Sequence, residues 1–426
     1  MANMRDGSGS NAAGARKRRV VIIGAGPMGL FAAWAAARRN FEVTVLERDR
    51  IGAALLTWGS ARFFSPLGMN LPAGLREILP GLPGDEALLT GPEMVDRVLL
   101  PLARSPWLYD RVRLRHRVLA VGRAGLARKD YPGHPIRHER PFRIAVAGPG
   151  SSGGKDSPGG PDFPGGGYEL EADLVLDASG VYGQPVGFGA GGLPVAGEKA
   201  AASACRLLRR LGDLEAYLET CQTGRVLLIG HGHSAAHALL ALEAASRSRD
   251  VTVTWSIRSR NQRPFRETAN DSLPERDRIV SAANALAAAP PAFLEVRRAS
   301  ALVSLAKEGK RLRASFASGA PGASAPEAAQ VEVDAVAAFT GYRPEAAHLS
   351  ELALDLSPIT EGTRGLHAVL SGATDCLSLP AVKPADLASG EPGFYLIGSK
   401  SYGRASTFLL RDGIRQVEMI LDSHAL

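Results

Sequence analysis

Cysteine is scarce in this sequence: its 426 residues include only Cys205, Cys221 and Cys376. Three widely spaced cysteines cannot form the disulfide framework of a small secreted protein. No C-x-x-C pair occurs either, which excludes a redox dithiol built from neighbouring cysteines. We therefore expect a reducing compartment and predict a cytoplasmic protein.

The chain also lacks a strong charge of one sign. Its 50 Lys and Arg residues nearly balance 43 Asp and Glu residues, which leaves a formal net charge of +7. Aromatic residues are only 6% of the chain and are not interleaved with a basic patch, so we expect no nucleic-acid partner. The length allows two or three domains with buried cores.

No long apolar run is free of turn residues. The basic residues at 16–19 and the apolar residues that follow resemble a signal peptide or a short membrane span, but the run is interrupted by glycines and a proline. A strand, a turn and a helix account for these residues better, so we expect no membrane partner. Residues 1–18 are predicted to be a disordered tail.

The chain is organised around a glycine motif near its start. Residues 20–23 predict a strand buried on both faces, and Gly24, Gly26 and Gly29 follow in the pattern G-x-G-x-x-G. The first glycine allows a tight turn, the second lets a pyrophosphate approach, and the third lets the helix pack on the strand. Pro27 begins a helix whose N-terminal N–H groups would face that pyrophosphate.

Glu47 ends the next predicted strand, at residues 43–46. A carboxylate at this point accepts hydrogen bonds from the ribose hydroxyls of an adenosine and repels a 2′-phosphate. A glycine turn that merely packs does not account for this residue. The first unit is therefore predicted to bind a dinucleotide without a 2′-phosphate.

A second unit of the same kind follows about two hundred residues later. Residues 225–229 predict a strand, and Gly230, Gly232 and Ala235 form G-x-G-x-x-A. The following strand, at 251–257, ends in Arg258 and Arg260 instead of an acid. A guanidinium pairs with a 2′-phosphate, which favours NADPH over NADH. The alternative is a solvated basic loop.

Three histidines surround the second glycine turn: His231, His233 and His237. His233 and His237 share a face of the predicted helix, which raises the question of a metal site. No carboxylate or thiol at ligand spacing completes a set of three or four ligands. We therefore predict no metal.

Other segments are predicted from local patterns. The loop at 57–70 is rich in aromatic and turn residues, and its residues Trp58, Phe64, Ser65 and Asn70 either contact a cofactor or substrate or anchor the core. Thr90 and Glu93 predict a capping box for a helix at 90–103. Residues 148–167, dominated by Gly and Pro, predict a flexible insertion.

Two similar segments close the units. Residues 172–182 and 333–344 each contain Asp, an apolar strand and a turn with Gly and Tyr, and the turns hold Gly180 and Gly341. Residues 391–421 then predict a strand, a glycine turn and a helix that return to the first unit. We predict an α/β fold of two Rossmann-like dinucleotide-binding domains, the second (196–339) inserted into the first (19–195 and 340–426).

This order of motifs resembles the flavoproteins that contain two dinucleotide-binding domains. GAGPMG, GHGHSA, FTGYRP and GFYLIG cover nearly the whole chain, and FFSPLGMN and FLLRDG are most similar to the bacillithiol-disulfide-reductase-like branch. The resemblance implies FAD in the first domain and NADPH in the second. The residues predicted to contact them are Gly24, Gly26, Pro27, Met28, Gly29, Glu47, Arg48, Trp58, Phe64, Ser65, Asn70, Gly180, Gly230, Gly232, His233, Ser234, Ala235, Arg258, Arg260, Gly341, Gly398, Ser399 and Lys400.

The resemblance also implies hydride transfer from NADPH to FAD. Met28 occupies the place where the bacillithiol branch can carry a cysteine, and the C-x-x-C of thioredoxin reductases is absent. This favours a monooxygenase in which a (hydro)peroxyflavin oxygenates a soft nitrogen or sulfur atom of a small molecule, with molecular oxygen as co-substrate. The alternative is a reductase of a small disulfide, quinone or other acceptor. No catalytic side chain is assigned, and the oligomeric state is left open, with a homodimer considered.

Overall fold

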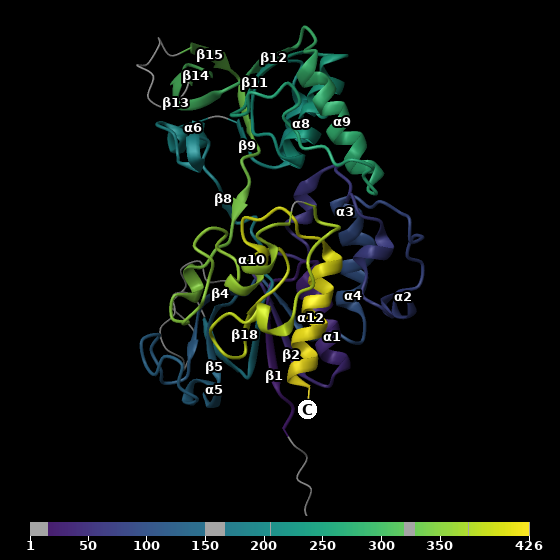
Figure 1. Cartoon of the computed structure of the whole chain (residues 1–426), viewed down its shortest axis with the longest axis vertical. Coiled ribbons are helices and arrows are strands. Elements are labelled where there is room, and N and C mark those ends of the chain that lie inside the picture. Colours follow the sequence, from purple (N-terminus) through teal and green to yellow (C-terminus); the bar gives the residue numbers. More distant parts are fainter. Residues whose placement is uncertain (1–15, 150–166, 205, 319–328, 374, 426) are drawn as a thin grey trace, which may run out of the picture.

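The computed structural model describes residues 16–149, 167–204, 206–318, 329–373 and 375–425. Most of the predicted tail (1–18) and of the predicted glycine-rich insertion (148–167) lies outside these residues. The chain forms two halves, one above the other in Figure 1. None of the helices in the described ranges is both long enough and apolar enough to cross a membrane.

The first half is built on a parallel five-stranded sheet in the order β18-β7-β1-β2-β3. Its strands are β1 (Arg19–Ile23), β2 (Glu42–Glu47), β3 (Val112–Leu114), β7 (Leu174–Asp177) and β18 (Phe394–Leu396). The order is not that of the sequence, because β7 and β18 return to the sheet beside β1 after long excursions. Strand β1 is therefore central, as its apolar composition predicts.

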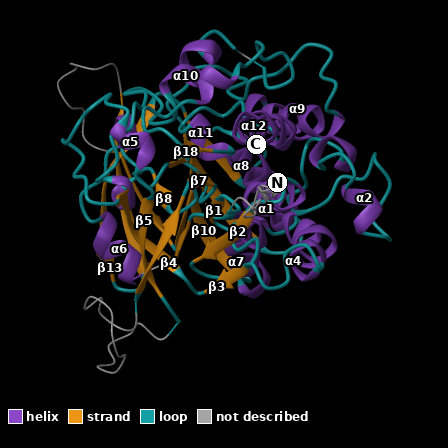
Figure 2. Ribbon diagram, turned by 90° about the horizontal axis from the view of Figure 1, so that it is seen from below, coloured by secondary structure: helices purple, strands orange, loops and turns teal. Residues whose placement is uncertain are grey.

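Alternate residues of β1 pack into two different cores. Val20 and Ile22 join the core under the helices α1 (Pro27–Arg38) and α12 (Leu410–His424). Val21 and Ile23 face the opposite core, beneath an antiparallel sheet of β4 (Arg117–Arg123), β5 (Phe142–Ala147) and β6 (Tyr168–Ala172). Figure 2 shows α1 and α12 on one side of the strands, and β4 and β5 on the other. The central sheet is thus covered on both faces.

The second half repeats this architecture. Its parallel sheet has the order β12-β11-β10-β16-β9, with β9 (Arg206–Leu208), β10 (Thr223–Ile229), β11 (Asp250–Ser256), β12 (Leu294–Arg297) and β16 (Ala335–Ala338). One face is covered by α7 (Leu211–Thr220), α8 (His233–Ser246) and α9 (Pro274–Ala288), and the other by β13 (Ser300–Glu308), β14 (Arg311–Ser318) and β15 (Ala329–Val333). The predicted fold class, two Rossmann-like units with one inserted into the other, is confirmed.

The two chain crossings between the halves pair with each other. Strand β8 (Gln184–Pro185) lies antiparallel to β17 (Tyr342–Arg343). The predicted limits at 195/196 and 339/340 stay a prediction, because this two-stranded ribbon belongs to neither large sheet. The remaining helices are α2 (Leu75–Ile78), α3 (Gly91–Met94), α4 (Leu100–Arg104), α5 (Ile136–Glu139), α6 (Glu198–Ala204), α10 (Arg364–Leu370) and α11 (Ser399–Tyr402).

Candidate active site

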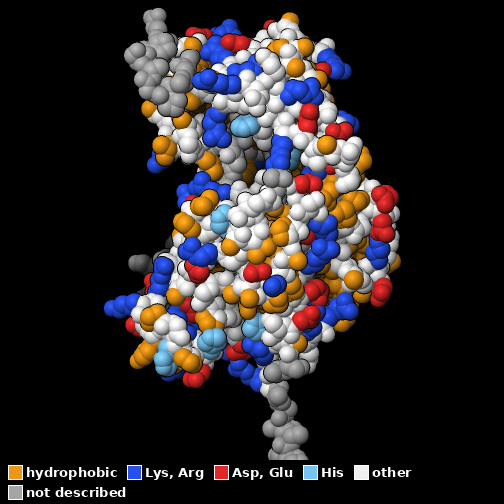
Figure 3. Space-filling view, viewed as in Figure 1, with side chains coloured by type: hydrophobic (Ala, Val, Ile, Leu, Met, Phe, Trp, Pro, Cys, Tyr) orange, Lys and Arg blue, Asp and Glu red, His pale blue; other side chains and the backbone are white. Residues whose placement is uncertain are grey.

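A cavity of about 1040 Å³ is lined by residues of both halves. Figure 3 shows the molecule hollowed where the upper half meets the lower one. Its lining includes both glycine turns, the ends of β2 and β11, and the closing segment after β18. Because the carboxyl ends of parallel strands are where open α/β sheets bind ligands, this cavity is the candidate site.

The glycines of the first turn have separate structural roles. Gly24 has φ +102°, a left-handed conformation that other residues rarely adopt. A Cβ at Gly29 would lie 1.9 Å from the carbonyl oxygen of Gly24, so this glycine lets α1 pack closely on β1. A Cβ at Gly26 would meet nothing within 4 Å. Gly26 therefore leaves an open cradle at the N-terminus of α1, which fits a pyrophosphate.

Glu47 is fixed at the cavity wall by backbone donors. Its Oε2 accepts a hydrogen bond from the N–H of Ala25 at 2.8 Å, and its Oε1 accepts one from the N–H of Asp49 at 2.8 Å. Arg48 lines the cavity next to it and donates to Glu345 at 3.2 Å. A carboxylate held in this way keeps lone pairs for the hydroxyls of an adenosine ribose.

The second turn reproduces the first. Gly230 has φ +116°, and a Cβ at Gly232 would meet nothing within 4 Å. Ser234 and Arg258 line the cavity, whereas Arg260 lies outside its lining. His231 also lines it, although it was not in the predicted set. Burial and the charge of Arg258 lower the pKa of His231, so its ring is neutral at neutral pH.

The loop at 57–70 is divided between the cavity and the core. Trp58, Phe64 and Ser65 line the cavity. Asn70 does not: it is buried, its Oδ1 accepts from the Ser65 hydroxyl at 2.8 Å, and its Nδ2 donates to the Ser65 carbonyl at 2.9 Å. Of the two predicted roles of Asn70, cofactor contact or core anchor, these contacts favour the anchor. Its side chain fixes the loop instead.

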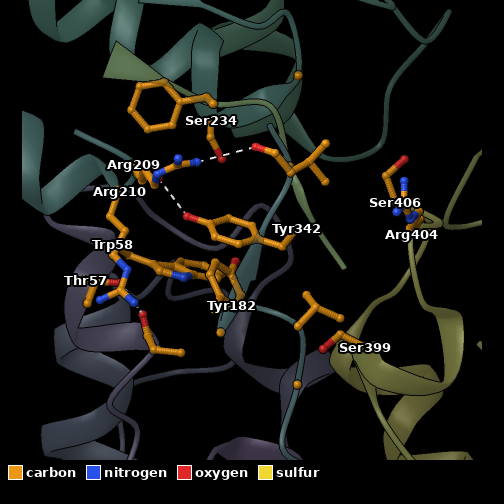
Figure 4. Close-up of a pocket in the computed structure, with 18 of the residues that line it drawn as sticks. Thr57, Trp58, Tyr182, Arg209, Arg210, Ser234, Tyr342, Ser399, Arg404 and Ser406 are labelled. Atoms are coloured by element: carbon orange, nitrogen blue, oxygen red, sulfur yellow. Dashed lines mark hydrogen bonds between the residues drawn. The ribbon is translucent and has the colours of Figure 1, made fainter. Parts of the chain in front are cut away.

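Phe64 joins the two halves. Its ring lies edge-on to His233 of α8, with centroids 5.1 Å apart, and is stacked with His237 at 5.7 Å. The N-terminus of the second nucleotide helix is thus covered by an aromatic side chain of the first half. Ser234, the next residue of α8, lies above Tyr342 in the view of the cavity in Figure 4.

An aromatic wall, formed by Trp58, Tyr182 and Tyr342, lines the middle of the cavity (Figure 4). Tyr182 lies 4.7 Å from Tyr342 and 6.4 Å from Trp58 between ring centroids. Burial raises the pKa of Tyr182 to about 12. The Tyr342 hydroxyl donates to the carbonyl of Arg209 at 2.7 Å. The two tyrosines come from the two similar Gly-Tyr turns, so the repeat in the sequence was the signal that could have identified them.

Lys400 is not among the residues that line the cavity, and its contact with the flavin stays a prediction. Its Nζ is buried, 2.7 Å from Oδ2 of Asp177 and 2.8 Å from the Ser179 hydroxyl. Burial opposes ionisation of Asp177, but the ammonium of Lys400 and a hydrogen bond from His348 hold the pKa of this carboxyl far below its usual value. Asp177 and Lys400 were not paired in the sequence analysis, because 222 residues separate them.

The other residues predicted to contact a cofactor also fall into two groups, those outside the cavity lining and those within it. Gly29 and Ala235 pack between helix and strand outside the lining, as the motif requires. Those that line the cavity are Pro27, Met28, Gly180, His233, Gly341, Gly398 and Ser399. The Met28 side chain packs closely against the backbone of Gly398. A Cβ added at Gly398 would lie only 2.7 Å from the Cγ of Met28. Within the described residues, no group of three or more His, Cys, Asp or Glu side chains could hold a metal ion.

Comparison with known proteins identifies the first glycine unit. Residues 19–135 match the family described as FAD dependent oxidoreductase. No curated protein sequence matches the chain. Among solved structures, bacillithiol disulfide reductase from Bacillus cereus is similar, with a TM-score of 0.64 and 17% identity over 96% of this chain and 99% of that one.

Two further structures have different activities. A cadaverine monooxygenase from Erwinia amylovora, bound to FAD, has a TM-score of 0.63 and 12% identity over 96% of this chain and 94% of that one. Thioredoxin reductase from Lactococcus lactis has a TM-score of 0.58 and 17% identity over 95% and 98%. At such identities the likeness establishes a shared fold only. Residues 19–135 thus match an FAD-dependent oxidoreductase family, and the whole chain shares its fold with these reductases and this monooxygenase.

Proposed function

We propose that this flavoprotein oxidises NADPH and uses the electrons to oxygenate a soft nitrogen or sulfur atom of a small molecule. The observation that carries the proposal is that one cavity is lined by both open glycine turns. Each turn presents the N-terminus of a helix of at least 12 residues, α1 or α8, to the same space. Two dinucleotides bound at these turns would therefore share one chamber.

The ends of the second strands support FAD in the first turn and NADPH in the second. Glu47 would accept hydrogen bonds from the ribose of FAD and would repel a 2′-phosphate. Arg258 lines the cavity at the end of β11, and none of the described carboxylates pairs with it. Its guanidinium is free to bind a 2′-phosphate. NADPH is thus preferred to NADH.

When bound, FAD supplies hydride acceptance from NADPH and electron transfer to the second substrate. The protein's own residues bind and orient the two cofactors and exclude water from the cavity. The backbone N–H groups at Gly26 and Gly232 would hold the two pyrophosphates, while Trp58, Tyr182 and Tyr342 form an apolar wall between the two turns. Such a wall limits the access of water to the reacting atoms.

The cysteines favour oxygenation over disulfide reduction. Cys221 is buried in the second half, where its thiol donates to the carbonyl of Thr223. Cys376 is buried beside Arg276 and Asp375. Neither of these side chains lines the cavity, and Met28 is the sulfur-containing residue that does. Among the described residues the lining contains no thiol, so electrons would pass directly to oxygen or to an acceptor in the chamber.

The overall reaction consumes one NADPH, one O₂ and one proton, and yields NADP⁺, water and the oxygenated substrate. The test is to reduce the purified yellow protein with NADPH and to mix it with oxygenated buffer in a stopped-flow spectrophotometer. A transient whose spectrum matches neither oxidised nor reduced flavin supports the oxygenase. Reoxidation without a transient, together with fast turnover on a quinone or a small disulfide, would assign the reductase instead.

A further inference from the structure

Arg258 lies in a long connection (257–273) between β11 and α9 that contains no helix or strand. The sequence leaves open whether this is a solvated basic loop, in which the guanidinium groups would move freely. In the structure, however, buried and half-buried side chains from outside the loop bind its backbone. The position of Arg258 is therefore set by residues that lie elsewhere in the second half.

Asn284 of α9 holds the centre of this loop. The residue is 0% exposed. Its Oδ1 accepts a hydrogen bond from the N–H of Phe265 at 3.0 Å, and its Nδ2 donates to the carbonyl of Phe265 at 2.9 Å. Nδ2 also donates to Oε1 of Glu267 at 2.8 Å. Both polar atoms of the amide thus serve the loop rather than the helix that carries them.

The same contacts decide which arginine faces the cavity. Oε1 of Glu267, held by Asn284, accepts a hydrogen bond from Nε of Arg263 at 3.1 Å, and the two side chains form an ion pair. Arg263 is not part of the cavity lining, whereas Arg258 is. The fold therefore uses Arg263 within the loop and leaves Arg258 for a ligand.

Arg298 fixes the part of the loop that follows Arg258. Its Nε donates to the carbonyl of Asn261 at 3.2 Å. On the other side of Arg258, the carbonyl of Ile257 accepts a hydrogen bond from the N–H of Ser300 at 3.1 Å. The backbone is thus tied down both before and after Arg258, which limits the positions that its guanidinium can reach.

Trp255 of β11 connects this loop to the second glycine turn. It is 0% exposed, and its indole N–H donates to the carbonyl of Gly230 at 2.8 Å. Its ring is stacked with that of Phe265, with centroids 5.4 Å apart and an interplanar angle of 17°. In the first unit the equivalent register position is occupied by Val45, which has no polar group that could reach the turn. The device belongs to the second unit alone.

We propose that Asn284 and Trp255 are positioning residues for the phosphorylated dinucleotide. Asn284 orders the loop so that Arg258 meets the 2′-phosphate, and Trp255 holds the turn that receives the pyrophosphate. A loop that is ordered in advance binds its ligand without the entropy cost of ordering it. This inference rests on the proposed function, because it takes the second turn and Arg258 as the NADPH site.

NADP⁺ and NAD⁺ separate the two roles, because they differ only in the 2′-phosphate. The full-length, FAD-loaded protein is titrated with each dinucleotide in a calorimeter, and the unfolding midpoint in urea is measured for each variant. Asn284→Ala should raise the Kd for NADP⁺ about tenfold and the Kd for NAD⁺ less than about twofold. A lower midpoint is expected too, since buried backbone groups lose their partner, but a loss of stability alone does not change the ratio of the two Kd values.

Trp255→Phe keeps an aromatic ring against Phe265 and removes the indole N–H. We expect both Kd values to rise about fivefold, with their ratio unchanged, because both dinucleotides use the turn. Trp34→Phe is the matched control. Trp34 is also buried, but its ring nitrogen has no hydrogen-bond partner in the described part of the chain, so neither Kd should change.

Ser281→Ala is the control for Asn284→Ala. Ser281 lies on the same helix, and its hydroxyl bonds Asp277 rather than the loop, so both Kd values should stay as in the parent protein. If Asn284→Ala does not fold, Arg298→Gln tests the same loop from a more exposed residue. It should lower the preference for NADP⁺ in the same direction.

The outcomes separate this inference from the proposed function. If the parent protein prefers NADP⁺ and the Asn284 and Arg298 variants keep that preference, the role of the loop anchors is refuted and the NADPH assignment stands. A loss in Trp255→Phe no larger than in Trp34→Phe refutes the role of Trp255. Equal Kd values of the parent protein for the two dinucleotides would instead refute the choice of NADPH, and the role of Asn284 with it.

Discussion

The Nζ atom of Lys400 lies 2.7 Å from Oδ2 of Asp177, and both atoms belong to side chains that are almost completely buried. Asp177 ends strand β7 and Lys400 lies on α11, shortly after strand β18, so the pair joins the closing segment to the sheet. A buried ion pair costs desolvation energy, but leaving one of its charges alone costs more.

Lys400→Met should therefore destabilise the protein strongly. We expect a loss of about 3–5 kcal/mol in the free energy of unfolding, because the Asp177 carboxylate would keep its burial and lose its counter-charge. Urea unfolding of the flavin-free chain, followed by tryptophan fluorescence, measures it. Adding Asp177→Asn should restore part of the loss, since the amide carries no charge. A single variant as stable as the parent would contradict the buried pairing.

Substitutions at the two open glycines, Gly26 and Gly232, should weaken cofactor binding without affecting folding. Gly26→Ala and Gly232→Ala place a methyl group where the structure has no atom within 4 Å, at φ values that alanine tolerates. Both variants should fold with unchanged unfolding midpoints. We expect Gly26→Ala to lose bound FAD, and Gly232→Ala to keep FAD while its KM for NADPH rises at least about tenfold, because the methyl group occupies the pyrophosphate position.

Gly29→Ala supplies the contrast to this pair. Its Cβ would lie 1.9 Å from the carbonyl oxygen of Gly24, so α1 could not stay in place on β1. We expect a poorly folded protein. The assignment of the two cradles would be wrong if Gly26→Ala kept FAD at parent affinity, or if Gly232→Ala lost FAD and left the KM for NADPH unchanged.

Arg258 predicts the preference between the two nicotinamide dinucleotides. Removal of its charge in Arg258→Gln should raise the KM for NADPH by about tenfold to a hundredfold, with less than a threefold effect for NADH, which lacks the 2′-phosphate. Steady-state oxidation of both dinucleotides measures the ratio. Arg260→Gln is the control, since Arg260 lies outside the cavity lining. Equal effects of Arg258→Gln on both dinucleotides would refute the 2′-phosphate assignment.

The features that the sequence predicts correctly are local ones. The strand, the glycine turn and the helix at 19–38 depend on neighbouring residues, and so does the capping box in which Thr90 and Glu93 bond each other's backbone. Burial of β1 on both faces follows from its unbroken apolar run. These features are set by backbone sterics and by the period of the apolar residues, which a sequence displays directly.

The features that were missed arise from contacts between distant segments. Lys400 was predicted to contact the flavin, and the sequence did not indicate that the fold brings the Asp177 carboxylate to its ammonium. Asn70 was predicted either to contact a cofactor or substrate or to anchor the core, and the sequence did not indicate that its amide would bond Ser65. The aromatic wall needs the crossings β8 and β17 to be side by side before Tyr182 can meet Tyr342. The resemblance to known flavoproteins supplied the order of the domains but not these partners.

The interface at Phe64 predicts how stability depends on pH. Burial lowers the pKa of His237 to about 4; nearby Glu275 raises it, while His233 and Arg278 lower it. In the unfolded chain the same histidine has a pKa of about 6.5. Between these values the unfolded state binds more protons than the folded one, so the free energy of unfolding falls as the pH falls from about 6.5 to 4.

His237→Gln removes this group and keeps a polar side chain of similar length against Phe64. We expect the parent protein to lose about 1–2 kcal/mol more stability than this variant between pH 7 and pH 4.5, after allowing for the partial exposure of the ring. Urea unfolding at half-unit intervals of pH measures both curves. Parallel curves would show that His237 takes up its proton in the folded state as readily as in the unfolded chain. In that case the ring would not be shielded by Phe64, and the contact between the two halves would be looser in solution than the 5.7 Å stacking distance indicates.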